Sequence, residues 1–293
     1  MSNFDSIKDL VEIADQENVK LSDIILRLQA KELGISEEQL LERMRITYHE
    51  MVLSLENAVK NDKKSLSGLT GGDANKLFEA IKTKRSVLPE FISKIIARAL
   101  ATGELNACMG KIVAMPTAGA CGIVPAVLLT VKEENSIDED VALQGLITAG
   151  GIGLVIANKA SISGAKGGCQ AECGSAASMA AAAMTKMLGG TNEMVANAAA
   201  LAMKNQLGLV CDPVAGLVEV PCIKRNVGGA MIAIAAAEMS LAGIKSVIPV
   251  DEVIWAMKNV GDQMSVNLKE SAKGGLAATK TGKEITENFI KSY

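Results

Sequence analysis

From Cys108 onward the chain is a succession of strongly apolar segments, and this feature constrains its fold more than any other. Alanine, glycine and methionine are abundant and aromatic residues make up only 2% of the sequence, which suits close packing between helices. Segments that are apolar nearly all round are typical of central helices in a bundle. The sequence therefore predicts an all-α multi-helix bundle with functional interhelical loops. The expected helices span roughly residues 119–132, 138–159, 170–188, 192–207, 224–242 and 250–264.

The first hundred residues differ, because charged and apolar positions alternate there at helical period. Helix starts are expected near Ser22 and at Ser36, where SEEQ matches a capping box and opens one long helix to about Lys60. A loop rich in glycine, serine and charge follows, before another helix near Asp73. We expect an amphipathic N-terminal region over 1–65 and a helical catalytic domain over 66–293, with one continuous domain as the alternative. Only EVPCI and KSVIPV hint at extended chain, so no substantial sheet is predicted.

Charge and hydropathy exclude several classes of function. The 30 basic and 33 acidic residues are interspersed and give a net charge of −3, so no nucleic-acid partner is expected. The apolar stretch 145–157 is shorter than the ~20 residues of a membrane span, and 227–242 contains Glu238, so both are expected to be buried helices, with no membrane partner. The start MSNFDSIKDL has no apolar signal segment, which favours a cytoplasmic location and free thiols.

Three cysteines are the main candidates for a cofactor site: Cys169, Cys211 and Cys222, which are 42 and 11 residues apart. Each lies near glycine, proline or a charged residue at an expected turn, and the spacing fits no zinc finger. Three thiolates that converge would hold an iron-sulfur cube by three corners and leave the fourth iron open as a Lewis acid. The alternative is that they are buried packing residues, as free cysteines often are. The other three cysteines are expected to be packing residues: Cys108, Cys121 and Cys173. For Cys173, four residues after Cys169, the alternative is a spare ligand.

Several loops pair small hydroxyl residues with glycine: SGLTGG, PTAGACG and SISGAKGG. Backbone amides in such turns can hold a carboxylate or phosphate, although capped connections between helices have the same composition. SGAKGG is also compatible with a pyridoxal-phosphate site at Lys166, but that fold needs alternating strands and helices. The single histidine, His49, lies in the long amphipathic helix and is expected to have a surface or packing role.

In its cysteines and its glycine loops, the chain resembles the alpha subunit of the iron-sulfur-dependent bacterial L-serine dehydratase, also called L-serine deaminase. The resemblance runs from about residue 67 to 277, through SGLTGGDA, MPTAGACGIVPAVL, SISGAKGGCQAECGSAASMAAAA, QLGLVCDPVAGLVEVPCIKRN and KGGLA. It implies a 4Fe-4S cluster on Cys169, Cys211 and Cys222. It also implies elimination of water from L-serine to aminoacrylate, which hydrolyses to pyruvate and ammonia. Such a lyase would serve serine catabolism and gluconeogenesis.

Within this reading the hydroxyl and glycine loops would grip the substrate carboxylate and amino group, with Ser67, Thr70 and Thr117 as the expected contacts. Lys224 and Asn226 follow the last cysteine closely enough to reach substrate. A non-catalytic iron-sulfur sensor or redox subunit would need only the three cysteines. A third alternative is a purely structural scaffold, which would need neither cysteines that act as ligands nor loops that bind a substrate.

The chain departs from single-chain members of this family in two ways. Those members carry an additional domain with an SSSHT-type histidine motif, which resembles nothing here, so the general base is expected from a separate beta subunit. They also end in a cysteine that can occupy the open iron, whereas this sequence ends KSY. The substrate-free cluster is therefore expected to be more exposed to oxygen.

Overall fold

A computed structural model describes residues 5–291, and within that range the chain is helical with no strand, as predicted. Its extended pairing there is a single bridge between Cys211 and Lys269. The α-helices are α1 (Ile7–Gln16), α2 (Leu21–Leu33), α3 (Glu37–Val59), α4 (Asp73–Lys82), α5 (Glu90–Ala107), α6 (Ile123–Glu134), α7 (Glu139–Lys159), α8 (Gly164–Gly167), α9 (Ser175–Met187), α10 (Asn192–Lys204), α11 (Cys222–Leu241), α12 (Val250–Gln263) and α13 (Lys280–Lys291). Short 3-10 or π-helical turns are η1 (Ala118–Ala120), η2 (Gln170–Gly174), η3 (Val214–Gly216), η4 (Val266–Leu268) and η5 (Gly275–Ala278).

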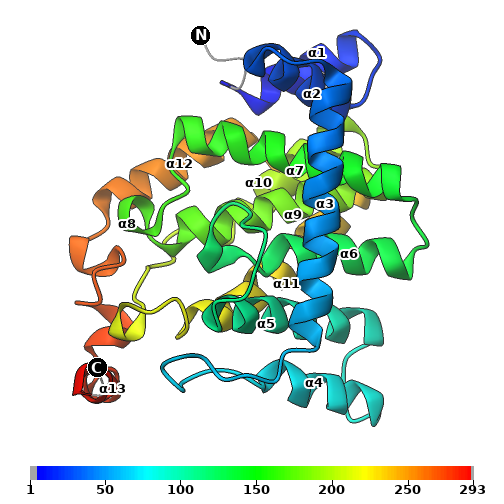
Figure 1. Ribbon diagram of the computed structural model, residues 1–293. Coiled ribbons are helices and arrows are strands. Elements are labelled where there is room, and N and C mark those ends of the chain that lie inside the picture. The colour runs from blue at the N-terminus through cyan, green and yellow to red at the C-terminus, as the bar shows by residue number, and fades with distance from the viewer. Residues whose placement is uncertain (1–4, 292–293) are drawn as a thin grey trace.

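Helix α9 forms the centre of the bundle, and all of its residues are buried. It packs against α6, α7, α10 and α11, which surround it in Figure 1. Small residues permit this close approach: a Cβ on Gly145 of α7 would lie 2.7 Å from Met187 Cγ, and one on Gly153 would lie 2.9 Å from Met179 Cε. The alanine and glycine content therefore sets the helix spacing of the core.

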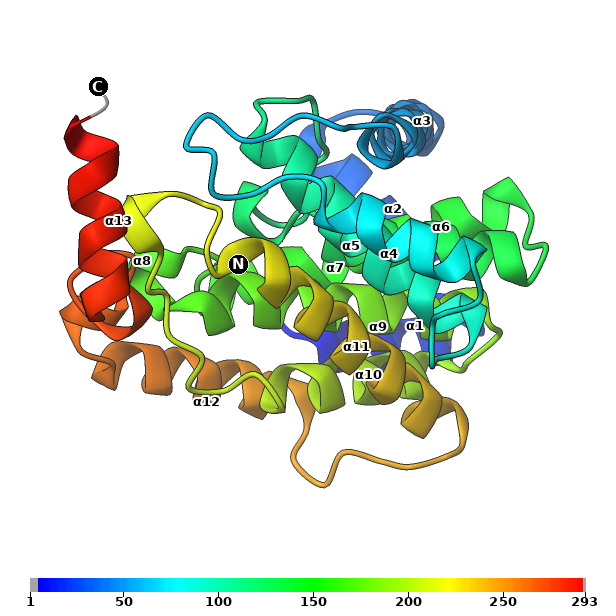
Figure 2. The same cartoon turned by 90° about the horizontal axis from the view of Figure 1, so that it is seen from below.

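The N-terminal helices cover one side of this bundle. Helices α1 and α2 lie at one end and α3 runs along the side of the molecule (Figure 1). Ile7, Leu10 and Met51 are fully buried or nearly so and belong to the same apolar core as α9. The division of the chain near residue 65 stays a prediction. At the other end α13 projects from the body and contacts η3 and η5 (Figures 1 and 2).

Most helix boundaries agree with the sequence. Ser36 closes a capping box with Gln39 at the start of α3, because its side chain accepts from the Gln39 amide while the Gln39 side chain accepts from the Ser36 amide. Two expected helices begin differently: η1 precedes α6, and the π-turn η2 precedes α9. The expectation of extended chain at EVPCI is wrong, because Cys222 already opens α11.

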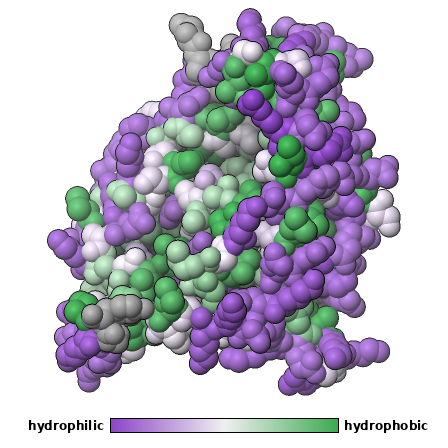
Figure 3. All heavy atoms as spheres, in the orientation of Figure 1, coloured by the Kyte–Doolittle hydropathy of each residue, from purple (hydrophilic) through white to green (hydrophobic). Residues whose placement is uncertain are grey.

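By length and composition alone, α7 is apolar enough to cross a membrane, and it is the one such helix within residues 5–291. Two thirds of its most apolar window, 67%, is buried against the rest of the protein. The surface to the left of α3 in Figure 3 gathers apolar and near-neutral residues, whereas hydrophilic residues dominate the side on which α3 lies.

Candidate active site

A cluster of buried thiols brings together chain segments that are far apart in the sequence. Cys169 immediately precedes η2, Cys211 lies in the loop after α10, and Cys222 is the first residue of α11; they are 2%, 3% and 8% exposed. The Cys169 sulfur hydrogen-bonds with the Cys211 thiol and lies 3.4 Å from the sulfur of Cys173. The structure therefore places Cys173, for which the sequence favours packing over a spare-ligand role, inside this thiol cluster. All six cysteines are free.

The surroundings of the thiol cluster favour ionisation of Cys169 over that of its neighbours. Hydrogen bonds from the thiols of Cys173 and Cys211, with the nearby Arg225 guanidinium, lower the pKa of Cys169 to about 3 despite its burial. The same contacts raise the pKa of Cys173 and of Cys211, because each donates to a thiolate in a buried site. Burial, followed by the charge on Cys169, raises the pKa of Cys222 to about 12. The pKa of Cys169 is therefore lowered, whereas those of Cys173, Cys211 and Cys222 are raised.

Within residues 5–291, no group of three or more His, Cys, Asp or Glu side chains closes around a point that could hold a single metal ion. A cubane cluster makes a different demand, because each cysteine binds a separate iron at its own corner. The arrangement of soft sulfur donors beside a guanidinium suits an iron-sulfur group better than a lone hard cation.

The Cys211 segment is held by the C-terminal part of the chain. The Cys211 amide donates to the Leu268 carbonyl (2.8 Å), and the Glu270 amide donates to the Cys211 carbonyl (2.7 Å). The next residue, Asp212, is 3% exposed, accepts from the Leu276 amide (2.7 Å) and lies 2.8 Å from Arg225 Nη1. Residues 268–276, which include part of the KGGLA segment, therefore hold Cys211 and Asp212 in place.

Glu172 lies at the point where two of the glycine loops meet the thiol cluster. It belongs to the π-turn η2, a helix type that is frequent at functional sites. Its Oε2 is 3.9 Å from the Cys211 sulfur, and a Cβ on Gly164 would lie 2.7 Å from the same oxygen. A Cβ on Gly119 would lie 3.2 Å from Oε1. The PTAGACG and SISGAKGG loops thus flank a single carboxyl group.

Burial raises the pKa of Glu172 to about 7, and the charge on Cys169 adds to that rise. The hydroxyl of Thr117 lies close enough to Glu172 to oppose the rise, yet this buried oxygen has no hydrogen bond of ordinary geometry within residues 5–291. Of the five residues expected to bind substrate, Thr117 is the one placed beside the thiol cluster with its side chain uncommitted.

Ser67 and Thr70 contact a carboxylate of the protein itself. Ser67 Oγ lies 2.8 Å and 3.0 Å from the two carboxylate oxygens of Glu219, and Thr70 Oγ1 donates to Glu219 Oε2 at 2.7 Å. Glu219 is 7% exposed and precedes Cys222 by one helical turn. The SGLTGG loop is therefore tied to the start of α11.

The glycine-loop amides that follow are also occupied. The backbone amides of Gly72, Asp73 and Ala74 donate to the carboxylate of Glu104 on α5, at 3.2, 2.8 and 3.3 Å. Glu104 is 2% exposed and caps the N-terminus of α4 from a neighbouring helix. These amides could hold a carboxylate, as the sequence suggested, but the carboxylate is supplied by the chain.

Asn226 and Lys224 lie on opposite sides of the first turn of α11. The amide of Asn226 is 1% exposed; it accepts from the Gly122 amide (2.8 Å) and donates to the carbonyls of Gly119 (2.8 Å) and Cys222 (2.9 Å). It clamps the PTAGACG loop to α11. The Lys224 ammonium is exposed and bonds Asp73 Oδ2 at 2.7 Å. Direct contact of either residue with substrate stays a prediction.

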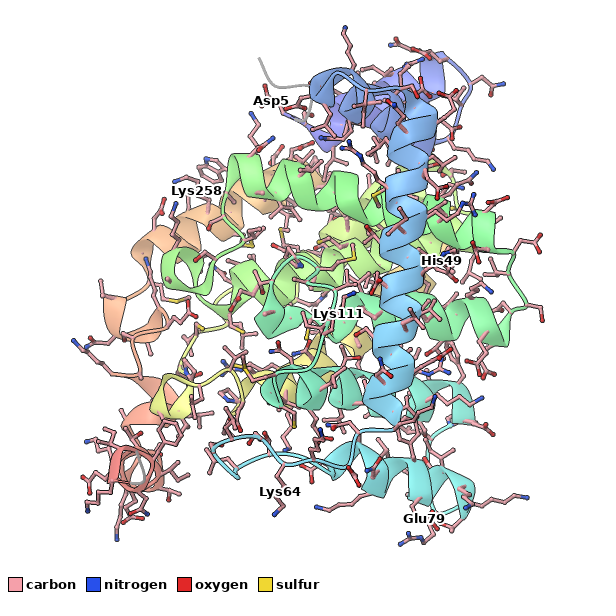
Figure 4. The ribbon with its side chains drawn as sticks, viewed as in Figure 1. Asp5, His49, Lys64, Glu79, Lys111 and Lys258 are labelled. Atoms are coloured by element: carbon pink, nitrogen blue, oxygen red, sulfur yellow. The ribbon has the colours of Figure 1, made fainter. Side chains whose placement is uncertain are left out.

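The remaining candidates lie outside the cluster. His49 lies on α3 (Figure 4), where its ring is 53% exposed and its Nε2 is 3.0 Å from Glu139 Oε1. Lys166 is exposed beside a small pocket of about 210 Å³ that Met257 and Asp262 also line. Cys121 is fully buried, whereas Cys108 is partly exposed and its thiol donates to the carbonyl of Lys63; a packing role for both stays a prediction.

A groove of about 560 Å³, large enough for a small ligand, adjoins the predicted loops. Ser67, Met109, Ala118, Glu219 and Phe289 are among the residues that line it. Its walls therefore include one residue next to Thr117 and the Ser67–Glu219 pair.

Sequence reasoning missed Glu172, Arg225 and Asp212, although all three stand within three residues of a predicted cysteine. Their short distance in sequence from those cysteines was the one signal that could have identified them. Charged residues next to cysteines are common, however, and only the fold shows that these side chains point at the same space.

Comparison with known proteins gives a consistent result. Residues 16–277 match the family model described as serine dehydratase alpha chain. The chain is 47% identical to a probable L-serine dehydratase alpha chain of Bacillus subtilis over 98% of this chain and 95% of that protein. It is 40% identical to the L-serine dehydratase alpha chain of Peptoniphilus asaccharolyticus over 97% of each chain. An L-serine dehydratase of Streptomyces coelicolor is 50% identical over 61% of this chain, which covers 40% of that longer protein.

Proposed function

The chain belongs to the serine dehydratase alpha chain family, and from that membership we propose that it is the alpha subunit of an L-serine ammonia-lyase. The observation that carries the proposal is the thiol cluster, since Cys169, Cys211 and Cys222 come from three segments and lie buried together. Such a subunit would convert L-serine to pyruvate and ammonia. A cytoplasmic location is part of the proposal, because free thiols persist in a reducing compartment.

We propose that Cys169, Cys211 and Cys222 hold a 4Fe-4S cluster. The donor set supports this, because thiolates are the usual ligands of such clusters. Arg225 places a positive charge beside Cys169, which offsets the negative charge of cysteine-ligated iron. When bound, the cluster supplies a Lewis acid at its iron without a protein ligand, which assists departure of the serine hydroxyl.

The protein groups then have to bind serine, orient it and move protons. A base removes the proton from the α carbon, the hydroxyl leaves as water, and the resulting aminoacrylate takes up water to give pyruvate and ammonium. Thr117 is suited to donate a hydrogen bond to substrate, since its hydroxyl is uncommitted beside the thiol cluster. Ser67 and Thr70 act through Glu219 as positioning residues, because their hydroxyls already bond that carboxylate.

The general base is assigned to a beta subunit. His49 supports this assignment, because the chain's single histidine is largely exposed on α3 and occupied by Glu139. The complete enzyme would therefore be a complex of alpha and beta subunits. Without the beta subunit the cluster would lose its iron in air faster than it does in the complex.

The test is to purify the alpha chain anaerobically together with its beta subunit and to measure pyruvate and ammonia formed from L-serine. We expect equal amounts of both products, and loss of activity when iron is removed with a chelator. A brown protein that forms no pyruvate would instead be an iron-sulfur sensor or redox subunit. Activity that survives complete iron removal, or that borohydride abolishes through a lysine adduct, would refute the proposal. Equal catalytic efficiency of Thr117→Ala and wild type would remove Thr117 from the substrate site.

A further inference from the structure

Glu172 is a largely buried carboxyl group without a cationic partner. Its oxygens face the Cys211 thiol and the backbone at Gly119 and Gly164. The ion pairs of residues 5–291 include the neighbouring Asp212–Arg225 pair but none for Glu172. Burial of a carboxylate without a positive partner is costly, and such groups normally pair with a cation. Glu172 therefore stands out among the buried acids of the chain.

The other buried carboxylates near the thiol cluster each have two or more hydrogen bonds or an ion pair with a cation of the protein; Asp212 Oδ1 has the Arg225 ion pair but no hydrogen bond of ordinary geometry. Glu104 accepts from three backbone amides, Glu219 from two hydroxyls, and Asp212 from the Leu276 amide beside Arg225. Each of these has an evident structural role, whereas the Glu172 carboxyl group has only a 3.9 Å contact with the Cys211 sulfur and lies beside the unbonded Thr117 hydroxyl. Among residues 5–291, the site thus places a carboxyl group without a cationic partner beside a hydroxyl without a hydrogen bond.

We propose that the Glu172 carboxylate binds the α-ammonium group of the substrate amino acid. An ammonium provides up to three donors and the positive charge that the site lacks. The inference rests on the proposed function and deepens it, because it names the residue that distinguishes an amino acid from other small carboxylic acids. Glu172 is assigned here to binding and not to removal of the α proton.

The walls around Glu172 also restrict what can bind. A Cβ on Gly164 would lie 3.0 Å from the Cys211 sulfur and 2.7 Å from the Glu172 carboxylate. Only glycine at position 164 therefore leaves the carboxylate accessible to a ligand. With Gly119 on the other side, the ammonium site is narrow. A primary ammonium fits such a site better than an N-alkylated one.

The test measures binding of unreactive ligands to the anaerobic alpha–beta complex by titration calorimetry. L-alanine and propionate share a carboxylate and a methyl group and differ in the ammonium, and neither has a hydroxyl to eliminate. We expect the wild-type complex to bind L-alanine at least tenfold more tightly than propionate. Glu172→Gln should weaken L-alanine binding by about tenfold or more, the range for a hydrogen bond to a charged group, and leave propionate within about twofold.

Two further variants serve as controls. Glu270→Gln removes a nearby exposed carboxylate, whose negative charge contributes to the raised pKa of Glu172. This change should leave the preference for L-alanine unchanged. Glu172→Asp keeps the charge on a shorter arm and should retain part of the preference. Because the readout is the ratio of the two affinities within one protein, a general loss of cluster or affinity does not imitate the effect.

The inference is overturned if Glu172→Gln keeps the wild-type preference, or if Glu270→Gln loses it to the same extent. If Glu172→Gln cannot be isolated as a folded complex, the wild-type protein decides alone: equal affinity for L-alanine and propionate overturns the inference. Failure of the proposed function has a different signature, namely a complex that forms no pyruvate from L-serine.

Discussion

Asn226→Ala should be one of the most destabilising single changes near the thiol cluster. The wild-type side chain is 1% exposed and connects α11 to the loop that precedes α6. Its Oδ1 accepts from the Gly122 amide, and its Nδ2 donates to the carbonyls of Gly119 and Cys222. Alanine removes all three bonds at a position that water does not reach.

The magnitude follows from the groups left behind. The Cys222 carbonyl keeps its helical partner in α11, but the Gly122 amide and the Gly119 carbonyl lose theirs. Each buried polar group without a partner costs about 1–3 kcal/mol. We therefore expect Asn226→Ala to lower the free energy of unfolding by about 4 kcal/mol, within a range of about 2–6.

The assay is urea unfolding of the purified chain under anaerobic, reducing conditions, followed by far-ultraviolet circular dichroism. Asn205→Ala is the matched control, because Asn205 is exposed and donates only to the Leu201 carbonyl at the end of α10. It should change the free energy of unfolding by less than about 0.5 kcal/mol. An Asn226→Ala protein within about 0.5 kcal/mol of wild type would refute the assignment of Asn226 as the clamp between α11 and the loop.

Two further predictions follow from single contacts. Gly164→Ala should reduce iron content and activity in a chain that still folds, since its Cβ would lie 2.7 Å from Glu172 and 3.0 Å from the Cys211 sulfur; the control Gly150→Ala, with nothing within 4 Å, should retain both. Normal iron content in Gly164→Ala would contradict the packing described here. Lys224→Met should raise the pKa of Asp73, which hydrogen bonds from Lys224 and Lys76 lower from 3.8 to about 2. Because the folded-state pKa is lowered, the stabilisation is present above about pH 4 and disappears as pH falls towards 2. Acid unfolding followed by circular dichroism should therefore begin at a higher pH in the variant, with a loss of less than about 1 kcal/mol at pH 7, as for an exposed ion pair. Unchanged acid unfolding would show that the Lys224–Asp73 bond contributes nothing in solution.

The helices were predictable because they depend on local sequence. Apolar periodicity located the central helices, and the Ser36 capping box fixed the start of α3. The turns η1 and η2 were not predictable in the same way, since such short helical turns are set by contacts with distant segments. Residues 118–120 are held by Asn226. The residues around Cys169 are held by Gln170, whose amide donates to the Leu209 carbonyl and whose side-chain oxygen accepts from the Gly208 amide.

In the candidate site, too, the residues marked by local composition were predictable, and those defined by distant contacts were not. Local composition identified Cys169, Cys211 and Cys222, because cysteines between glycine, proline and charge are unusual in an alanine-rich helical chain. It could not reveal that Ser67 and Thr70 bond Glu219, or that Lys224 reaches Asp73, since these partners are about 150 residues away. Glu172 was overlooked for the same reason: its importance comes from what surrounds it after folding.

The most direct test of the central claim is the iron and acid-labile sulfide content of the anaerobic alpha–beta complex, measured with pyruvate formation from L-serine. The wild type should contain about four irons and four sulfides per alpha chain. Cys169→Ala, Cys211→Ala and Cys222→Ala should each lose most of both and the activity with them. Cys121→Ser, at a fully buried position away from the thiol cluster, should keep its iron if it folds. A complex that makes pyruvate without iron, or cysteine variants that keep full iron and sulfide, would contradict the account.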